Sequence, residues 1–165
     1  MSIKFFVIIE DKKEEQEKAI EAIANTLANG EQPERSTVGP RAIFKEAKIL
    51  VSLASNLKEA RTWLSFVAKL NETGSVTPLV LTDLMFPAKE GSREEPNGLG
   101  VITTCIELSL PVVVCSDTDH HDVNYLKDVF PVLGTAHPTG EIPVILDNKD
   151  WVRAVREMFR LVDVP

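Results

Sequence analysis

The fold of this chain is decided by the stretch Leu79-Val80-Leu81-Thr82-Asp83-Leu84-Met85-Phe86-Pro87. Its first residues are apolar and partly β-branched and lie between Pro78 and Pro87, a pattern typical of a buried strand of a parallel sheet. Asp83 stands where the apolar run stops. A carboxylate in that place lies at the carboxyl edge of the sheet, where open α/β folds bind their ligands. A strand-end carboxylate that only accepts hydrogen bonds from the following turn is the plainer alternative.

A second acidic site also stands directly after a run that is typical of a buried strand. The run from Ile3 to Ile9 is apolar and ends in Glu10-Asp11. If the two strands are neighbours, three carboxylates converge on one crevice and repel one another unless a cation lies between them. Mg²⁺ prefers such oxygen ligands, so the pattern predicts a magnesium site. Taken without Asp83, Glu10-Asp11 would equally suit the start of a helix.

Composition restricts the class of protein. The 165 residues favour one domain, and 44% hydrophobic with 26% charged residues is ordinary for a globular protein. The net charge of −7 weighs against nucleic-acid binding. No apolar stretch approaches the ~20 residues that cross a bilayer. Cys105 and Cys115 have no ligand spacing, so we interpret them as buried thiols and expect a cytoplasmic protein.

Apolar runs alternate with amphipathic segments along the chain. We predict one α/β domain over 1–165, with a doubly wound, five-stranded parallel sheet and helices on both faces. The expected strands are 3–9, 48–54, 79–82, 111–115 and 142–146, and helices are expected over 14–27, from 57, from 99, around 123–130 and from 151. Polar segments without regular structure are expected at 30–47, 88–97 and 134–141.

These motifs resemble the receiver domain of two-component response regulators. The resemblance depends on Glu10-Asp11 after the first strand, the run from Asp83 to Pro87 after the third, and Ser116 after the fourth. It extends over nearly the whole chain in the order of elements, but only these short motifs match in residue identity. It implies a flavodoxin-like strand order, 2-1-3-4-5, which makes the first and third strands neighbours.

The resemblance also implies roles for individual residues. Asp83 would accept a phosphoryl group from a histidine kinase or phosphotransfer protein, and Ser116 would hydrogen-bond a phosphoryl oxygen. Mg²⁺ would be held by Glu10, Asp11, Asp83 and the backbone carbonyl of Met85. The implied protein is a signalling domain rather than an enzyme, apart from its own phosphorylation and dephosphorylation.

The lysine that the family carries directly after strand five is displaced here. The nearest candidate is Lys149, which follows Asp147 and Asn148 and precedes Asp150. If Asp147 or Asn148 occupies the family's lysine position, the chain would be a pseudo-receiver that acts as an interaction module without phosphorylation. The aromatic residue that the family carries on strand five is also missing.

A metal-dependent nucleic-acid enzyme of the toprim class is a further alternative, since Glu10 with Asp117 and Asp119 matches its Glu and Asp-x-Asp pattern. The acidic net charge and the run after Asp83 oppose it. A haloacid-dehalogenase phosphatase fits less well, because Met85 replaces the second Asp. Adjacent His120 and His121 diverge on a helix, which weighs against a transition-metal site over 116–122.

We expect a receiver without an output domain that signals through protein contacts. The expected surface is formed by the fourth and fifth helices and the fifth strand.

Overall fold

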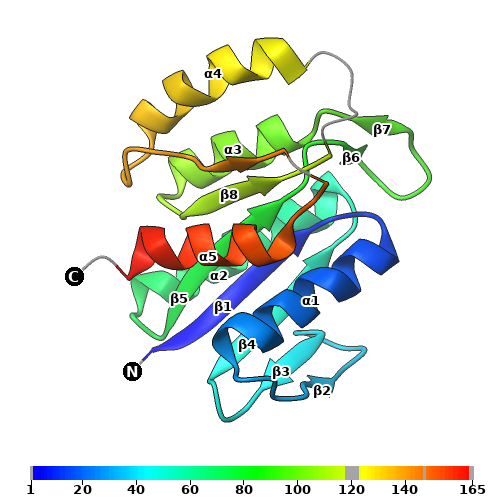
Figure 1. Ribbon diagram of the computed structural model, residues 1–165, viewed down its shortest axis with the longest axis vertical. Helices are drawn as coiled ribbons and strands as arrows, with labels where there is room; N and C mark the ends of the chain where they lie inside the picture. Colours follow the sequence, from blue (N-terminus) through cyan, green and yellow to red (C-terminus); the bar gives the residue numbers. More distant parts are fainter. Residues whose placement is uncertain (1, 118–122, 147, 164–165) are drawn as a thin grey trace.

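The computed structural model describes residues 2–117, 123–146 and 148–163, and it shows a mixed α/β domain (Figure 1). The strands are β1 (Ile3–Ile9), β2 (Glu34–Arg35), β3 (Ala42–Phe44), β4 (Ile49–Ala54), β5 (Val76–Thr82), β6 (Phe86–Pro87), β7 (Glu94–Glu95), β8 (Val112–Cys115) and β9 (Val144–Ile145). The helices are α1 (Lys13–Leu27), α2 (Leu57–Glu72), α3 (Gly98–Glu107), α4 (Val123–Ala136) and α5 (Trp151–Val162).

One large sheet runs through the domain in the order β2-β3-β4-β1-β5-β8-β9. Five of its strands, β4, β1, β5, β8 and β9 in spatial order, are parallel to one another, so β1 lies between β4 and β5. Ile9 is opposite Thr82 on β5 and Ala54 on β4, so these three strands end at one level. Apolar runs form these strands because both faces of the sheet are buried.

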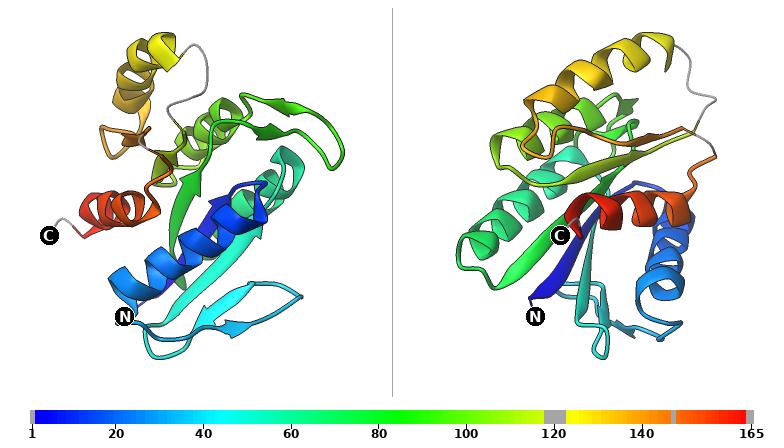
Figure 2. Two further views of the ribbon diagram at one scale, coloured as in Figure 1. Left: turned by 45° about the vertical axis from the view of Figure 1, so that its right-hand side comes forward. Right: turned by 60° about the vertical axis from the view of Figure 1, so that its left-hand side comes forward.

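Helices cover both faces of the sheet, as predicted. Helices α1 and α5 lie on one face, and α2 and α3 lie on the other (Figures 1 and 2). The side chains of β1 alternate between the two cores: Phe6 and Ile8 pack under α1 and α5, whereas Phe5 and Val7 pack under α2 and α3. This alternation follows from the two-residue period of a strand.

The predicted five-stranded sheet of order 2-1-3-4-5 was wrong, because the large sheet has seven strands, and two further strands lie beside β4 at one edge. Part of the expected polar segment 30–47 forms these two strands: β3 is antiparallel to β4, and β2 is antiparallel to β3. Pro33 and Pro40, which argued against a regular element, lie just outside these short strands. Ala42 and Phe44 are buried against the core while Ile43 is half-buried, which is the alternation of a strand.

The segment expected to be irregular at 88–97 is also partly regular. Strands β6 and β7 form a small antiparallel hairpin directly after Asp83, separate from the large sheet. The side-chain amide of Asn97 donates to the carbonyl of Phe86 at 2.7 Å and closes the base of this hairpin. Cys105 and Cys115 are buried free thiols, as predicted. Among the described residues, no helix has the length and apolar character needed to span a membrane.

Candidate functional site

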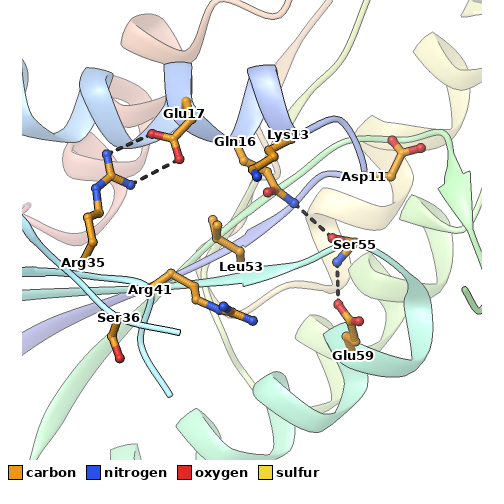
Figure 3. Close-up of a pocket in the computed structure, with 10 residues that line it drawn as sticks. All are labelled: Asp11, Lys13, Gln16, Glu17, Arg35, Ser36, Arg41, Leu53, Ser55 and Glu59. Atoms are coloured by element: carbon orange, nitrogen blue, oxygen red, sulfur yellow. Dashed lines mark hydrogen bonds and ion pairs between the residues drawn. The ribbon is translucent and has the colours of Figure 1, made fainter. Parts of the chain in front are cut away.

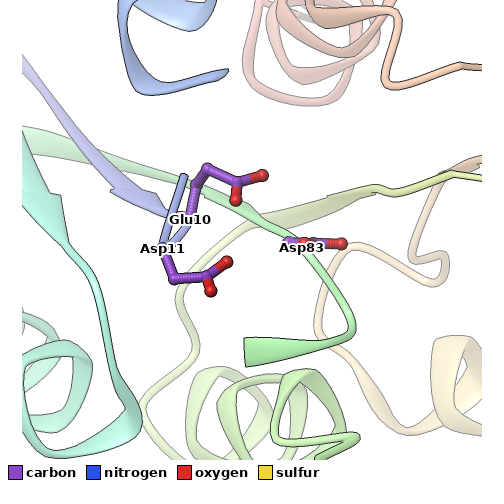
Figure 4. A group of neighbouring side chains, drawn as sticks. All are labelled: Glu10, Asp11 and Asp83. Atoms are coloured by element: carbon purple, nitrogen blue, oxygen red, sulfur yellow. The ribbon is translucent and has the colours of Figure 1, made fainter. Parts of the chain in front are cut away.

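Three carboxylates meet where β1 and β5 end (Figure 4). The parallel register brings Glu10 and Asp83 together, and the backbone N–H of Asp83 donates to the carbonyl of Ile9 at 2.9 Å. One oxygen from each of Glu10, Asp11 and Asp83 lies within 4.8 Å of the other two. Glu10 and Asp83 are buried, and Asp11 is half-buried. The convergence expected from the sequence is therefore present.

Both oxygens of Asp83 have hydrogen-bond donors. Oδ1 accepts from the backbone N–H of Leu84 and from the hydroxyl of Ser116, each at 2.7 Å. Oδ2 accepts from the ammonium of Lys149 at 2.9 Å. Ser116 follows β8, the neighbour of β5, and is fully buried. The three donors come from separate segments of the chain and fix the orientation of one carboxylate.

Lys149 reaches the site in spite of its late position after β9. Asn148 and Lys149 both adopt left-handed backbone conformations, with φ of 52° and 50°, which turn the chain sharply before α5. The ammonium then donates to Glu10 Oε2 at 2.6 Å as well as to Asp83. The side chain of Lys149 is only 2% exposed. This contact could not be predicted from the sequence, because left-handed residues other than glycine are uncommon.

Burial and neighbouring charges shift the pKa values of Glu10 and Lys149. Burial and the charge of Asp83 raise the pKa of Glu10 to about 8, against the opposing effect of Lys149. Burial by itself would lower the pKa of Lys149, but the charge of Asp83 and the hydrogen bonds to Glu10 and Asp83 outweigh it, and the pKa lies above its ordinary value. With a proton on Glu10, the group formed by Glu10, Asp83 and Lys149 is electrically neutral. Such neutrality suits a buried cluster.

Asp11 provides the test of whether this donor set fits a divalent cation. Its Oδ1 is buried and has no hydrogen-bond partner among the described residues. An unpaired buried carboxylate oxygen is costly, and a cation there would satisfy it. Three carboxylates that supply only oxygen match the preference of Mg²⁺. Glu10, Asp11 and Asp83 therefore fit a magnesium ion.

Several residues around the site were not anticipated from the sequence. Gln16 of α1 is buried, and its side-chain amide donates to the backbone carbonyl of Glu10 at 2.6 Å. The backbone N–H of Lys12 donates to Glu10 Oε1 at 2.9 Å. A polar residue on the inner face of α1, beside Ala19 and Ile20, was the signal that could have identified Gln16.

Gly98, the first residue of α3, packs directly on the backbone of Asp83 and Leu84. A Cβ atom at this position would lie 2.5 Å from the carbonyl oxygen of Asp83 and 2.7 Å from Cα of Leu84. The backbone N–H of Gly98 donates to the carbonyl of Leu84 at 3.0 Å. Only glycine permits this approach, so α3 supports the end of β5.

Glu94 of the β6–β7 hairpin is a fourth carboxylate near the site. Burial and the charge of Asp11 raise the pKa of Glu94 above its ordinary value. The sequence indicated only a polar segment here, since nothing in it shows how the hairpin folds back.

The remaining predicted residues have mixed outcomes. Met85 is half-buried two positions after Asp83, and its role as a backbone ligand stays a prediction. Asp117 is half-buried. Asp119, His120 and His121 lie outside the described residues, so the toprim pattern and the transition-metal site over 116–122 stay untested.

Comparison with known proteins yields the fold alone. No family model matches the chain, and neither does any curated protein. A solved structure described as a yeast Spc42 trimeric coiled-coil segment fused to another structure matches with a TM-score of 0.50 and 18% sequence identity. The match covers 98% of this chain and 83% of that one. At this identity the similarity concerns the fold and carries no function.

Proposed function

We propose that this protein is a receiver-like phosphoacceptor that takes a phosphoryl group on Asp83 with the help of Mg²⁺. One observation carries the proposal: the Lys149 ammonium and the Ser116 hydroxyl hydrogen-bond different oxygens of Asp83, beside Glu10 and Asp11. Lysine, hydroxyl and acidic pair are the features that the resemblance to response-regulator receivers implies.

The chemistry suits these residue types. An oxygen of Asp83 attacks the phosphorus of the donor, and a new O–P bond forms while the bond to the donor's leaving group breaks. The leaving group departs with the electron pair of that bond. Phosphoryl transfer depends mainly on positioning and on neutralisation of charge. Lys149 supplies a fixed positive charge and Ser116 a hydroxyl donor, and Mg²⁺, when bound by the carboxylates, would neutralise further phosphoryl charge.

The topology supports the same class. The parallel strands taken alone follow the order β4-β1-β5-β8-β9, which is the second, first, third, fourth and fifth of them along the chain. This partial order resembles the flavodoxin-like order, although β2 and β3 at one edge make the order of the whole sheet different. The proposed donor is a histidine kinase or phosphotransfer protein, and the proposed output is recognition by a downstream protein in the cytoplasm.

The burial of Asp83 favours a second candidate function. Its side chain is 2% exposed and both oxygens are already hydrogen-bonded. A donor therefore reaches Asp83 only if the surrounding loops open. A pseudo-receiver, which recognises partners without phosphorylation, keeps the Lys149–Asp83 ion pair as a permanent structural link.

Intact-mass spectrometry after incubation with acetyl phosphate and Mg²⁺ separates the two candidates. The phosphoacceptor gains one labile phosphoryl group, and Asp83→Asn gains none. An unmodified wild-type protein under saturating donor would leave the pseudo-receiver as the better account.

The toprim-like alternative is tested by another substitution. It would use Glu10, Asp117 and Asp119 in a metal-dependent reaction on nucleic acid. Under our proposal, Asp119→Asn leaves phosphorylation of Asp83 unchanged, and the protein neither cleaves nor extends nucleic acid. Mg²⁺-dependent cleavage that Asp119→Asn abolishes would favour the toprim class.

A further inference from the structure

A polar pocket of about 630 Å³ lies next to the carboxylates, between α1, the β2–β3 segment, the end of β4 and the start of α2 (Figure 3). Asp11 lines this pocket and also belongs to the carboxylate group, so the two sites share a wall. Pockets of this size hold small molecules. The pocket depends on β2 and β3, the strands added to the parallel sheet.

Two of the three acidic residues that line the pocket, Glu17 and Glu59, already accept hydrogen bonds, and the third, Asp11, belongs to the carboxylate group. Glu17 accepts two hydrogen bonds from the guanidinium of Arg35, at 2.9 and 3.3 Å. The carboxylate of Glu59 accepts from the backbone N–H of Ser55 at 2.8 Å. These contacts offset the negative charge that both residues would present to a ligand.

Two basic side chains of the pocket have no carboxylate partner among the described residues. Arg41 and Lys13 line it, and neither forms an ion pair within the part of the chain that the structure describes. Arg41 is held in place by its backbone, whose N–H donates to the carbonyl of Val51 on β4 at 2.8 Å. In Figure 3 its guanidinium extends toward Ser55 and Glu59. A guanidinium on a fixed backbone is well suited to phosphate or carboxylate.

Polar and apolar groups complete the wall. The Gln16 side chain, which also bonds to Glu10, donates to the hydroxyl of Ser55 at 3.1 Å. Half-buried Leu53 of β4 adds an apolar surface. A ligand with an anionic group and a carbon skeleton matches this combination.

We propose that this pocket binds a small organic anion, with Arg41 and Lys13 contacting its phosphate or carboxylate groups. The net charge of −7 and the pocket's volume of about 630 Å³ favour a small molecule over a nucleic acid. The binding requires neither phosphorylation nor the proposed function of Asp83. Since Asp11 borders both sites, the ligand lies within reach of the carboxylate group.

The test is titration of the protein in metal-free, low-salt buffer with three probes: inorganic pyrophosphate, ATP and citrate. Calorimetry measures the affinity, and backbone amide NMR locates the binding. We expect saturable binding of at least one probe, with shifts at Lys13, Ser36, Arg41 and Ser55. Binding of pyrophosphate or ATP identifies phosphate as the recognised group, and binding of citrate alone identifies carboxylate.

Arg41→Gln should weaken binding by about tenfold or more, the effect of losing a charge-assisted hydrogen bond. Arg61→Gln is the matched control, because Arg61 is exposed on α2 outside the pocket and its loss changes the net charge equally. Affinity in that variant should stay within about twofold. Asp83→Asn cannot be phosphorylated and should bind the probes with the affinity of the wild type. Binding in the pocket can therefore be confirmed even if Asp83 proves not to be a phosphoacceptor.

Two outcomes would overturn the proposal. One is the absence of saturable binding of all three probes below about 10 mM. The other is an equal loss of affinity in Arg41→Gln and Arg61→Gln, which would indicate unspecific attraction to surface charge. Arg41 is exposed, so its substitution should leave the melting temperature nearly unchanged, and the melting temperature verifies that the variant is folded.

Discussion

Lys149 and Asp83 are 66 positions apart in the sequence, and the Lys149 ammonium donates a 2.9 Å hydrogen bond to Asp83 Oδ2 inside the protein. The same ammonium lies 2.6 Å from Glu10 Oε2. A single buried cation thus ties the ends of β1 and β5 to the turn before α5. We therefore expect this side chain to contribute to the stability of the fold.

Substitution of Lys149 should therefore destabilise the protein. Lys149→Met leaves the buried side chains of Asp83 and Glu10 without their cationic partner, and we expect a loss of about 3 kcal/mol in the free energy of unfolding. Urea unfolding at pH 7 measures it. The control is Lys45→Met, which breaks the exposed pair with Glu34 and should cost about 0.5 kcal/mol or less. Equal losses in the free energy of unfolding would show that the buried pair stabilises the fold no more than the exposed pair does.

Stability should also depend on pH through Glu10. Its pKa is about 8 in the folded protein, above the ordinary value of 4.5, so between these values the folded state holds a proton that the unfolded state has lost. Stability contributed by Glu10 is present at low pH and is lost as the pH rises toward 8. The slope is at most about 1.4 kcal/mol per pH unit. Urea unfolding between pH 5 and 8 should show this decline in wild type, relative to Glu10→Gln. Parallel curves for the two proteins would contradict it.

Millimolar Mg²⁺ should raise the melting temperature, because a cation satisfies Asp11 and relieves repulsion among the carboxylates. The increase should be larger at pH 8 than at pH 6, since protons compete for Glu10. Asp11→Ala should remove most of the response. Glu21→Gln, a change at an exposed carboxylate of α1, should keep it. A response that survives in Asp11→Ala would place the metal elsewhere, with the region 117–122 as the first candidate.

Gly98→Ala should disturb the site from outside, because its Cβ would lie 2.5 Å from the carbonyl oxygen of Asp83. We expect a loss of about 1–3 kcal/mol in stability and slower phosphorylation. Gly100→Ala on the same helix is the matched control. Its Cβ would be 3.7 Å from Leu57, and the change should stabilise the helix by about 0.5–1 kcal/mol. Urea unfolding and the rate of phosphorylation compare the two variants, and equal behaviour would contradict the supporting role of α3.

Much of this arrangement could be predicted from the sequence, because buried parallel strands have recognisable apolar runs. Those runs placed Glu10, Asp83 and Ser116 at one edge of a sheet. The strands β2 and β3 could not be predicted in this way, since two or three residues are too few to show a period. The contact of Lys149 depends on the left-handed conformation of Asn148 and Lys149, which tertiary packing imposes. The wall that Asp11 forms between the pocket and the carboxylate group likewise depends on segments that are distant in sequence.

Chemical trapping of the phosphorylated residue tests the central claim most directly. Borohydride reduces an aspartyl phosphate to homoserine, and peptide mass spectrometry then locates the changed position. After treatment with acetyl phosphate and Mg²⁺, we predict homoserine at position 83 and an unchanged peptide when Mg²⁺ is omitted. Homoserine at Asp11 or Asp117, or no reduction product in a folded and Mg²⁺-bound protein, would contradict the assignment of Asp83 as the phosphoacceptor.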